Sequence, residues 1–228
     1  MRRRTTRCRD ARHPELELEV GSAGPALSDR LFEWIESSVR AGTTFDIGET
    51  VRFCSAMFQV RGRSDKSLAL YEPKPGSMPV VWIDSVEDSL RTLERQRDVC
   101  TSVGLGDELD FPDPLRLTYF CRRVARDARI TFARGPAQAK DSGWIAICCQ
   151  PDHDHDDPDE VDCVTIHELG TMIPEFRLIQ ALPVSCAVRL GAGKPVELAF
   201  ERKLRAIPEQ SLLQTLGCDS RPAFERGW

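Results

Sequence analysis

The sequence predicts an α+β fold of two strand-rich modules, each with a mixed or antiparallel sheet and one or two packed helices. Apolar residues make up 41% of the 228 residues, which is enough for a sizeable core. Both halves contain short apolar stretches typical of strands, together with segments of helical periodicity. The proline-containing segment 110–114 lies between the two halves, and it is the best candidate for a linker.

The first module is expected over residues 27–110, after a disordered basic tail over residues 1–26. Ser28 is the expected N-cap of a helix that ends at Gly42. The buried face of this helix is predicted from spacings of three and four residues. That face comprises Leu31, Phe32, Ile35 and Val39.

Strands and a second helix complete the first module. Strands are expected over residues 50–54 and 57–60, as one long or two short strands, and over 68–71 and 80–83. A turn over residues 61–65 would join two of them as a hairpin. Ser85 is the expected start of the second helix, which ends at Gly104. Its predicted buried face comprises Val86, Leu90, Leu93 and Cys100.

The second module is expected over residues 115–207, followed by a C-terminal tail over residues 208–228 that begins with a short helix. Residues 165–182 are typical of a helix that is interrupted at Pro174. Strands are expected over residues 117–121, 130–133, 144–148, 184–190 and 196–200. Because both halves combine strands with helices, they could be two similar modules.

The distribution of charge excludes several classes of function. The chain has 31 basic and 36 acidic residues, and six of the arginines lie in the first dozen residues. The body is therefore clearly acidic, opposite to what a general nucleic-acid binder needs.

Apolar runs reach only four or five residues, whereas a membrane-spanning helix needs about 20. A secretory signal needs an apolar segment after its basic residues, and none follows the first arginines. We therefore expect the protein in the cytoplasm.

The nine cysteines include no CxxC pair. Their odd number and their position within apolar runs favour buried thiols in a reducing compartment, rather than disulfides or a zinc knuckle. We therefore expect no cofactor.

An acidic loop over residues 152–162 is the most conspicuous local feature. It does not fit a calcium-binding EF-hand, because Asp157 occupies the position of the required glycine and Cys163 that of the bidentate glutamate. His153 and His155 give a weak zinc or nickel alternative. The remaining hypotheses are a solvated loop and a partner-binding surface. The candidate partner-binding residues are Asp152, Asp154, Asp156, Asp157, Asp159, Glu160, Asp162 and Glu168.

No catalytic residue is predicted. The chain lacks the GxSxG, phosphate-binding GxxxxGK[ST] and GxGxxG motifs. His167 and Glu168 begin like a zinc-protease helix, but Thr171 stands where the second histidine is needed. One ligand and one base do not hold a zinc ion.

The motif Asp141-Ser142-Gly143-Trp144 has a simple structural interpretation. Aspartate and serine favour a turn, glycine permits a close backbone approach, and tryptophan starts an apolar strand. Together with the preceding strand and the later segment 178–185, the motif resembles the immunity protein 33 family of bacterial polymorphic toxin systems. The resemblance covers residues 117–203. The chain departs from the family in its His/Asp loop, which replaces a Gly-Asp-Glu segment, and in Ser185, where glycine is commoner.

This resemblance implies an immunity protein that binds and neutralises a cognate antibacterial toxin in interbacterial competition, with type VI secretion as one candidate route of delivery. The expected partner is a toxin with a basic active-site cleft, which the acidic loop would complement. One alternative is a metal-dependent enzyme using His153, His155 and His167 with nearby carboxylates. Another is a regulatory or scaffold module that binds its partner through the basic N-terminal segment.

Overall fold

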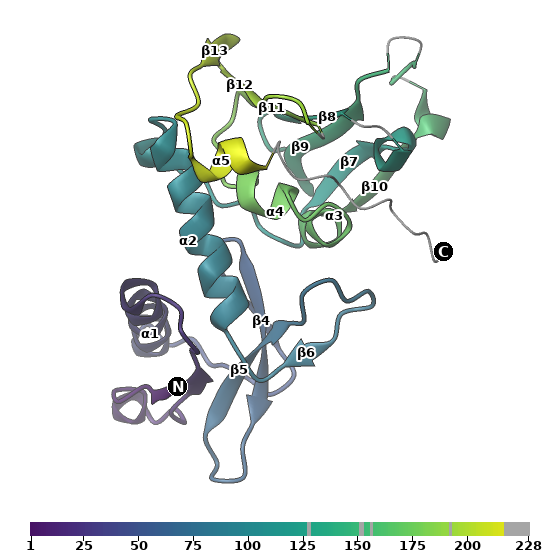
Figure 1. Ribbon diagram of the computed structural model, residues 1–228. Helices are drawn as coiled ribbons and strands as arrows, with labels where there is room; N and C mark the ends of the chain where they lie inside the picture. The colour runs from purple at the N-terminus through teal and green to yellow at the C-terminus, as the bar shows by residue number, and fades with distance from the viewer. Residues whose placement is uncertain (127–128, 151–152, 156, 192, 217–228) are drawn as a thin grey trace. The chain divides into compact units, whose positions relative to one another are not determined.

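The computed structural model describes residues 1–126, 129–150, 153–155, 157–191 and 193–216 (Figure 1). Two compact units make up the chain: unit 1, Met1–Glu94, and unit 2, Arg95–Trp228. Helices and mixed or antiparallel sheets occur together, which confirms the α+β class. The boundary lies within helix α2 (Glu87–Ser102) and not in the predicted linker 110–114, so the predicted division of the chain is wrong on this point.

Unit 1 contains a four-stranded antiparallel sheet whose strands follow one another in chain order. These strands are β3 (Thr50–Phe53), β4 (Ala56–Gly62), β5 (Leu68–Pro73) and β6 (Trp82–Ile83). The predicted strands 50–54, 57–60 and 68–71 are confirmed, whereas only Trp82 and Ile83 of the predicted strand 80–83 are in a strand. Residues 50–54 and 57–60 belong to two strands joined by a turn at Cys54 and Ser55, and φ of Cys54 is +54°. Phe58 and Leu70 are fully buried on neighbouring strands, so this sheet has its own apolar face.

Helix α1 (Pro25–Arg40) buries the predicted face, comprising Leu31, Phe32, Ile35 and Val39. Its start differs from the prediction, because Gly24 is the N-cap and Pro25 opens the first turn. Proline is favoured there, since the first helical N–H groups have no partner within the helix. Ser28 lies inside the helix, where its hydroxyl donates to the Pro25 carbonyl at 2.9 Å.

The first 26 residues are folded, so the prediction of a disordered basic tail is wrong. Strand β1 (Arg2–Arg4) pairs antiparallel with β2 (Glu17–Glu19). Leu16 and Leu18 are completely buried. The arginines face acids of the same unit: Arg3 pairs with Asp29 at 2.6 Å, Arg2 with Asp84 at 3.3 Å and Arg4 with Asp65 at 3.4 Å.

A buried carboxylate caps helix α2. Glu72 at the end of β5 is 1% exposed, and it accepts hydrogen bonds from the backbone N–H groups of Asp88 at 3.2 Å and Ser89 at 2.7 Å. Ser85, the predicted cap, accepts one from Glu87 N–H at 3.0 Å. A negative charge at this end also complements the helix dipole. The predicted buried positions Val86, Leu90, Leu93 and Cys100 are all buried.

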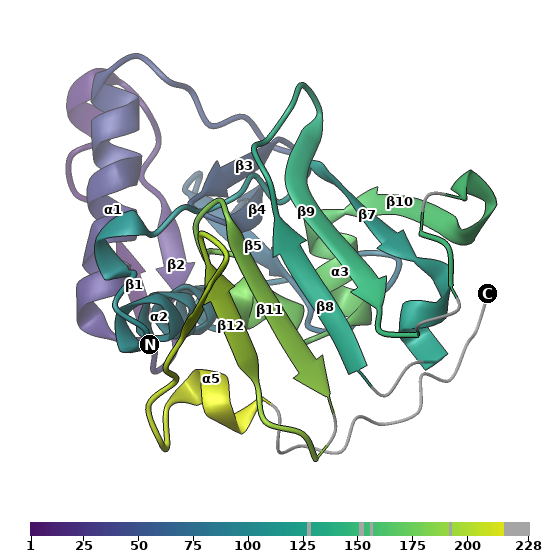
Figure 2. The ribbon, with the colours of Figure 1, turned by 90° about the horizontal axis from the view of Figure 1, so that it is seen from above.

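Unit 2 is built on a seven-stranded mixed sheet in the order β10-β7-β9-β8-β11-β12-β13, and Figure 2 labels all of these strands except β13. The strands are β7 (Leu117–Cys121), β8 (Arg129–Arg134), β9 (Asp141–Cys148), β10 (Val161–Thr165), β11 (Cys186–Gly191), β12 (Glu197–Phe200) and β13 (Lys203–Arg205). The pair β7–β9 is parallel and the other pairs are antiparallel. The two edge strands, β10 and β13, were not predicted. This topology differs from that of unit 1, so the two modules are not similar.

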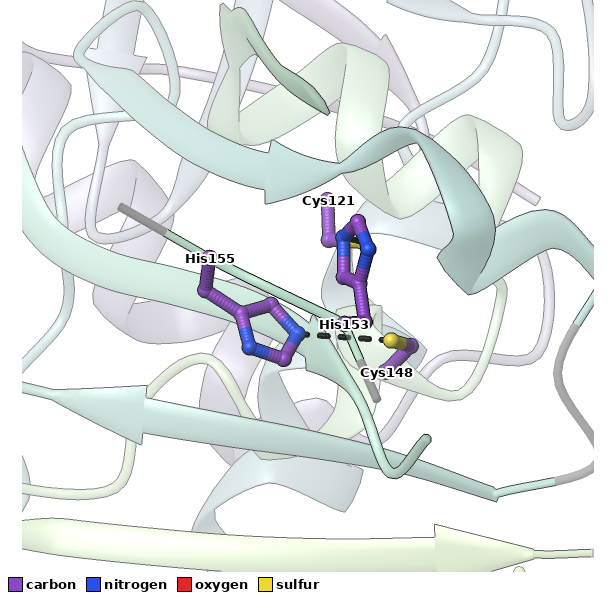
Figure 3. A group of neighbouring side chains, drawn as sticks. All are labelled: Cys121, Cys148, His153 and His155. Carbon is purple, nitrogen blue, oxygen red and sulfur yellow. Dashed lines mark hydrogen bonds between the residues drawn. The ribbon is translucent and has the colours of Figure 1, made fainter. Parts of the chain in front are cut away.

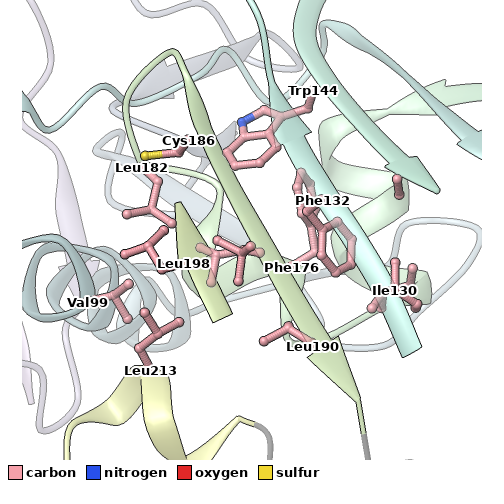
Figure 4. Packing of buried hydrophobic residues seen from close by; sticks show 14 of the residues in the cluster. Val99, Ile130, Phe132, Trp144, Phe176, Leu182, Cys186, Leu190, Leu198 and Leu213 are labelled. Atoms are coloured by element: carbon pink, nitrogen blue, oxygen red, sulfur yellow. The ribbon is translucent and has the colours of Figure 1, made fainter. Parts of the chain in front are cut away.

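The core of unit 2 lies against one face of this sheet. Phe176 stacks on Phe132 and contacts the edge of Trp144, with ring centroids 5.3 and 5.4 Å apart (Figure 4). The predicted broken helix is confirmed as two short helices on either side of Pro174. They are α3 (Ile166–Met172) and α4 (Phe176–Ile179).

Short helical segments complete the fold. Helix α5 (Leu212–Thr215) lies in the predicted C-terminal tail, and its Leu213 belongs to the unit 2 core. The rest of that tail, from residue 217, lies outside the described residues. The 3-10 turns are η1 (Arg9–Ala11), η2 (Gly106–Glu108), η3 (Arg122–Arg126) and η4 (Pro158–Glu160). Among the described residues, no helix is long and apolar enough to cross a membrane.

Candidate functional site

The DSGW motif forms the first half of β9 and positions the tryptophan in the core. Asp141 accepts a hydrogen bond from Gly143 N–H at 2.7 Å, and the Ser142 hydroxyl accepts one from Trp144 N–H at 3.2 Å. Gly143 has φ +80°, and a Cβ atom there would lie 2.1 Å from the Gly135 carbonyl oxygen. The motif therefore starts within the strand, and its glycine is required by both conformation and close approach.

Trp144 also packs against a buried arginine. The Arg134 guanidinium lies 5.6 Å from the indole ring centre and donates to the carbonyls of Asp110 at 2.8 Å and Leu182 at 2.5 Å. It pairs with the Asp110 carboxylate at 2.9 Å. Burial lowers the pKa of Arg134, while the Asp110 charge opposes that shift. These contacts join strand β8 to two loops, so the motif residues are best explained by folding.

The acidic loop connects β9 to β10 and includes η4. Three of its acidic residues, Asp154, Asp157 and Asp159, are exposed. The Asp157 carboxylate accepts from Asp159 N–H at 2.9 Å and so caps η4. Two further candidates, Asp152 and Asp156, lie outside the described residues.

Two arginines after β7 fasten the end of this loop. Arg122 donates to both carboxylate oxygens of Asp162, at 2.9 and 2.8 Å, and to the Asp159 carbonyl at 2.7 Å. Arg123 pairs with Glu160 at 3.2 Å. These hydrogen bonds hold the pKa of Asp162 and that of Glu160 below the ordinary values. Asp162 and Glu160 are therefore engaged in ion pairs within the protein.

Glu168 is engaged in a similar way. Its carboxylate accepts from Thr165 N–H at 2.8 Å, and the Thr165 hydroxyl accepts from Glu168 N–H at 3.2 Å. This is a capping box at the start of α3. Glu168 was predicted to bind a partner. In the structure its carboxylate instead caps helix α3.

A cluster of two cysteines and two histidines lies between the sheet and this loop. Cys121 ends β7, Cys148 ends β9, and His153 and His155 follow on the loop. One side-chain donor atom from each residue lies within 4.8 Å of the others (Figure 3). Cys121 Sγ is 3.0 Å from His153 Nε2, and Cys148 Sγ is 3.3 Å from His155 Nε2. The four side chains thus converge on one point.

The cluster is shielded from solvent. Cys121, Cys148 and His153 are buried, and His155 is half-buried. The two imidazole rings meet edge to face, with centroids 4.6 Å apart. The backbone N–H of Arg123 donates to Cys121 Sγ at 3.3 Å. Chemically, this is a set of soft sulfur and imidazole donors with the composition of a tetrahedral metal site.

The sequence indicated the two histidines but not the thiols that accompany them. A zinc knuckle is recognised by cysteines that are close together in the chain, whereas Cys121 and Cys148 are brought together by the parallel pairing of β7 with β9. The available signal was that each cysteine ends a predicted apolar strand. His167, the third histidine of the enzyme alternative, is not part of the cluster found among the described residues.

Comparison with known proteins gave no match to a family model, to a curated protein or to a solved structure.

Proposed function

We propose that this protein is a cytoplasmic immunity protein that neutralises an antibacterial toxin by binding it. The observation that carries the proposal is the acidic loop, which presents Asp154, Asp157 and Asp159 to solvent. The arginine pairs of Asp162 and Glu160 fasten the loop where it joins β10. The resemblance of residues 117–203 to the immunity protein 33 family supports the same function.

A fastened acidic loop suits recognition of a basic cleft. The part of the loop held by the ion pairs of Asp162 and Glu160 loses less conformational entropy on binding than an unheld segment would. Exposed carboxylates complementary to a basic cleft accelerate association and disfavour partners of the wrong charge. Occlusion of a toxin in this way requires no catalytic group on the immunity protein.

The two alternatives have weaker support. A catalytic zinc ion usually keeps a coordination position open for water or substrate, whereas the cluster offers four protein donors. Binding through a flexible basic arm requires an unfolded N-terminal segment. In unit 1 that segment forms β1 and pairs with β2.

The decisive experiment is capture of the partner followed by a killing assay. Full-length protein is used as bait in a lysate of the producing strain, and bound proteins are identified by mass spectrometry. We expect a stoichiometric partner whose C-terminal domain kills a host lacking this protein, and growth should return when both are co-expressed. A captured partner that is harmless, or whose toxicity persists on co-expression, contradicts the proposal.

Charge reversal tests whether the loop is the binding surface. We expect the variant D154K/D157K/D159K to reduce affinity for the toxin at least about tenfold, with a melting temperature lowered only by the loss of the Asp157 cap of η4. The matched control is D107K/E201K/E209K, which makes the same change in net charge at exposed acids outside the loop. Equal loss of affinity in the two variants would assign the effect to overall charge and reject the loop as the binding surface.

A further inference from the structure

The four side chains of the Cys/His cluster come from two parts of the chain that the fold must bring together. Cys121 and Cys148 lie at the carboxyl ends of neighbouring parallel strands. His153 and His155 lie on the loop that leaves β9, and both ring nitrogens facing the thiols are Nε2. All four donor atoms lie within 4.8 Å of one another, so the set is more than two separate thiol–imidazole pairs.

The spacing of the donors matches a tetrahedral zinc ion. With Zn–S of about 2.3 Å and Zn–N of about 2.0–2.1 Å, tetrahedral angles separate the donor atoms by roughly 3.3–3.8 Å. A sulfur–nitrogen pair around such an ion is about 3.5 Å apart, so the two observed distances, 3.0 and 3.3 Å, are shorter by about 0.2–0.5 Å, and every donor pair lies within 4.8 Å. Binding would therefore require side-chain shifts of up to about 1 Å.

Burial and charge also favour a metal ion here. Cys121, Cys148 and His153 are buried, although His153 belongs to a strongly charged loop. Two thiolates and one Zn²⁺ carry no net charge, which removes most of the cost of burying ionised groups. The N–H group of Arg123 donates to Cys121 Sγ, and a donor in this position stabilises a metal-bound thiolate.

We propose that Cys121, Cys148, His153 and His155 bind a structural zinc ion. Binding displaces the two thiol protons to solvent and forms two Zn–S and two Zn–N bonds. Four protein ligands fill a tetrahedral coordination sphere, which is typical of structural rather than catalytic zinc. The ion connects His153 and His155 of the acidic loop to the ends of β7 and β9. Exposed Asp154 lies between these two histidine ligands in the sequence. This inference is independent of the proposed toxin-binding function.

Metal analysis of the isolated full-length chain provides the primary test. The protein is expressed with zinc, freed of any histidine tag, passed over a desalting column and assayed by inductively coupled plasma mass spectrometry. We expect about one zinc ion per chain, and less than about a tenth of that in C121S, C148S and H153N/H155N. Wild-type protein without stoichiometric zinc, or variants that retain it, would overturn the proposal.

Matched controls keep the same chemistry outside the cluster. C149S removes an exposed thiol next to Cys148, C163S removes an exposed thiol on β10, and H167Q removes a histidine that is not in the cluster. All three should retain the zinc content of the wild type. Loss of zinc in these controls to the same extent as in the cluster variants would show that the metal is bound elsewhere or nonspecifically.

Two measurements on the wild-type chain avoid the problem of variants that fail to fold. Chelation should lower the melting temperature by several degrees, and zinc should restore it. Replacement by Co²⁺ should give an intense visible spectrum of tetrahedral cobalt with thiolate charge-transfer bands. A pale octahedral spectrum, or a Cys121–Cys148 disulfide in freshly prepared protein, would contradict the site. None of these readouts involves a toxin, so they distinguish failure of this proposal from failure of the proposed function.

Discussion

The sheets of the two units differ in how the chain passes through their strands. In unit 1, β3 to β6 are adjacent in chain order and antiparallel. In unit 2, β9 lies between β7 and β8 and runs parallel to β7. The carboxyl ends of neighbouring antiparallel strands point in opposite directions, whereas those of parallel neighbours lie side by side at the same end of the sheet. Only the second arrangement aligns the ends of two strands.

This difference explains where the candidate site lies. The parallel pair places Cys121 and Cys148 side by side, and the loop that leaves β9 adds two histidines. The local order of unit 1 instead favours contacts between segments close in the chain, such as Glu72 with the start of α2. Strand order, more than composition, explains why the Cys/His cluster forms in unit 2.

The largest expected effect comes from Trp144, at the centre of the unit 2 core. Trp144→Ala should destabilise unit 2 by about 3–5 kcal/mol, because it leaves a cavity and removes the hydrogen bond from Nε1 to the Gln180 carbonyl. Hydrogen exchange should rise in β8, β9 and β11 and stay nearly unchanged in β3 to β5. Trp144→Phe should have a smaller effect. Equal acceleration of exchange in both units would show that they unfold together, and would contradict independent stability of the two units.

A smaller effect is expected from the buried carboxylate of unit 1. Glu72→Ala removes the acceptor of two backbone N–H groups at the start of α2, and it should cost about 1–3 kcal/mol in the free energy of unfolding. Glu72→Gln, which keeps one oxygen, should give an intermediate loss in urea denaturation. Glu33→Ala, an exposed acid on α1, should have almost no effect. Similar losses for Glu72→Ala and Glu33→Ala would exclude the capping role.

The smallest effect is a pH dependence confined to unit 2. Burial lowers the pKa of His167, and Arg177 lowers it further while Glu168 opposes the shift. The neutral imidazole is therefore favoured by folding. Its contribution is complete above the unfolded pKa of about 6.5 and is lost as the pH falls toward the folded pKa, at no more than about 1.4 kcal/mol per pH unit.

Urea denaturation between about pH 7 and pH 5 tests this dependence. Wild-type protein should lose more stability on acidification than H167Q, and comparing the two cancels proton uptake by the groups they share. Parallel pH curves for the two proteins would exclude His167 as the source. Hydrogen exchange should assign the acid-sensitive region to α3 and the strands it covers, and not to unit 1.

Helical periodicity predicted the buried faces of the two long helices. The buried faces of α1 and α2 follow from spacings within one segment, so no knowledge of tertiary structure is needed. The N-terminal segment was misjudged because its six arginines outweighed the alternation of residues 15–20, in which Leu16 and Leu18 are buried. That alternation is typical of a strand. The acids that pair with Arg3, Arg4 and Arg7 are Asp29, Asp65 and Glu36, which lie outside the N-terminal segment and beyond the reach of local patterns.

Predictions of the site failed where strand order matters. Strand β10 was missed because its acidic Asp162 continues the charged loop, and only pairing with β7 and with Arg122 reveals it as a strand. Glu168 was predicted to bind a partner, although the Thr165–Glu168 spacing is that of a capping box. The meeting of Cys121 with Cys148 depends on the position of β9 beside β7, which no local sequence pattern specifies.

The short strand β13 has a consequence for behaviour at high concentration. It forms one edge of the seven-stranded sheet, and its Leu204 is 79% exposed. An edge strand with an exposed apolar side chain favours pairing with strands of other molecules. Lys203 and Arg205 flank this leucine, and the strand is only three residues long. Like charges on approaching copies repel one another, so these two residues act as gatekeepers against aggregation.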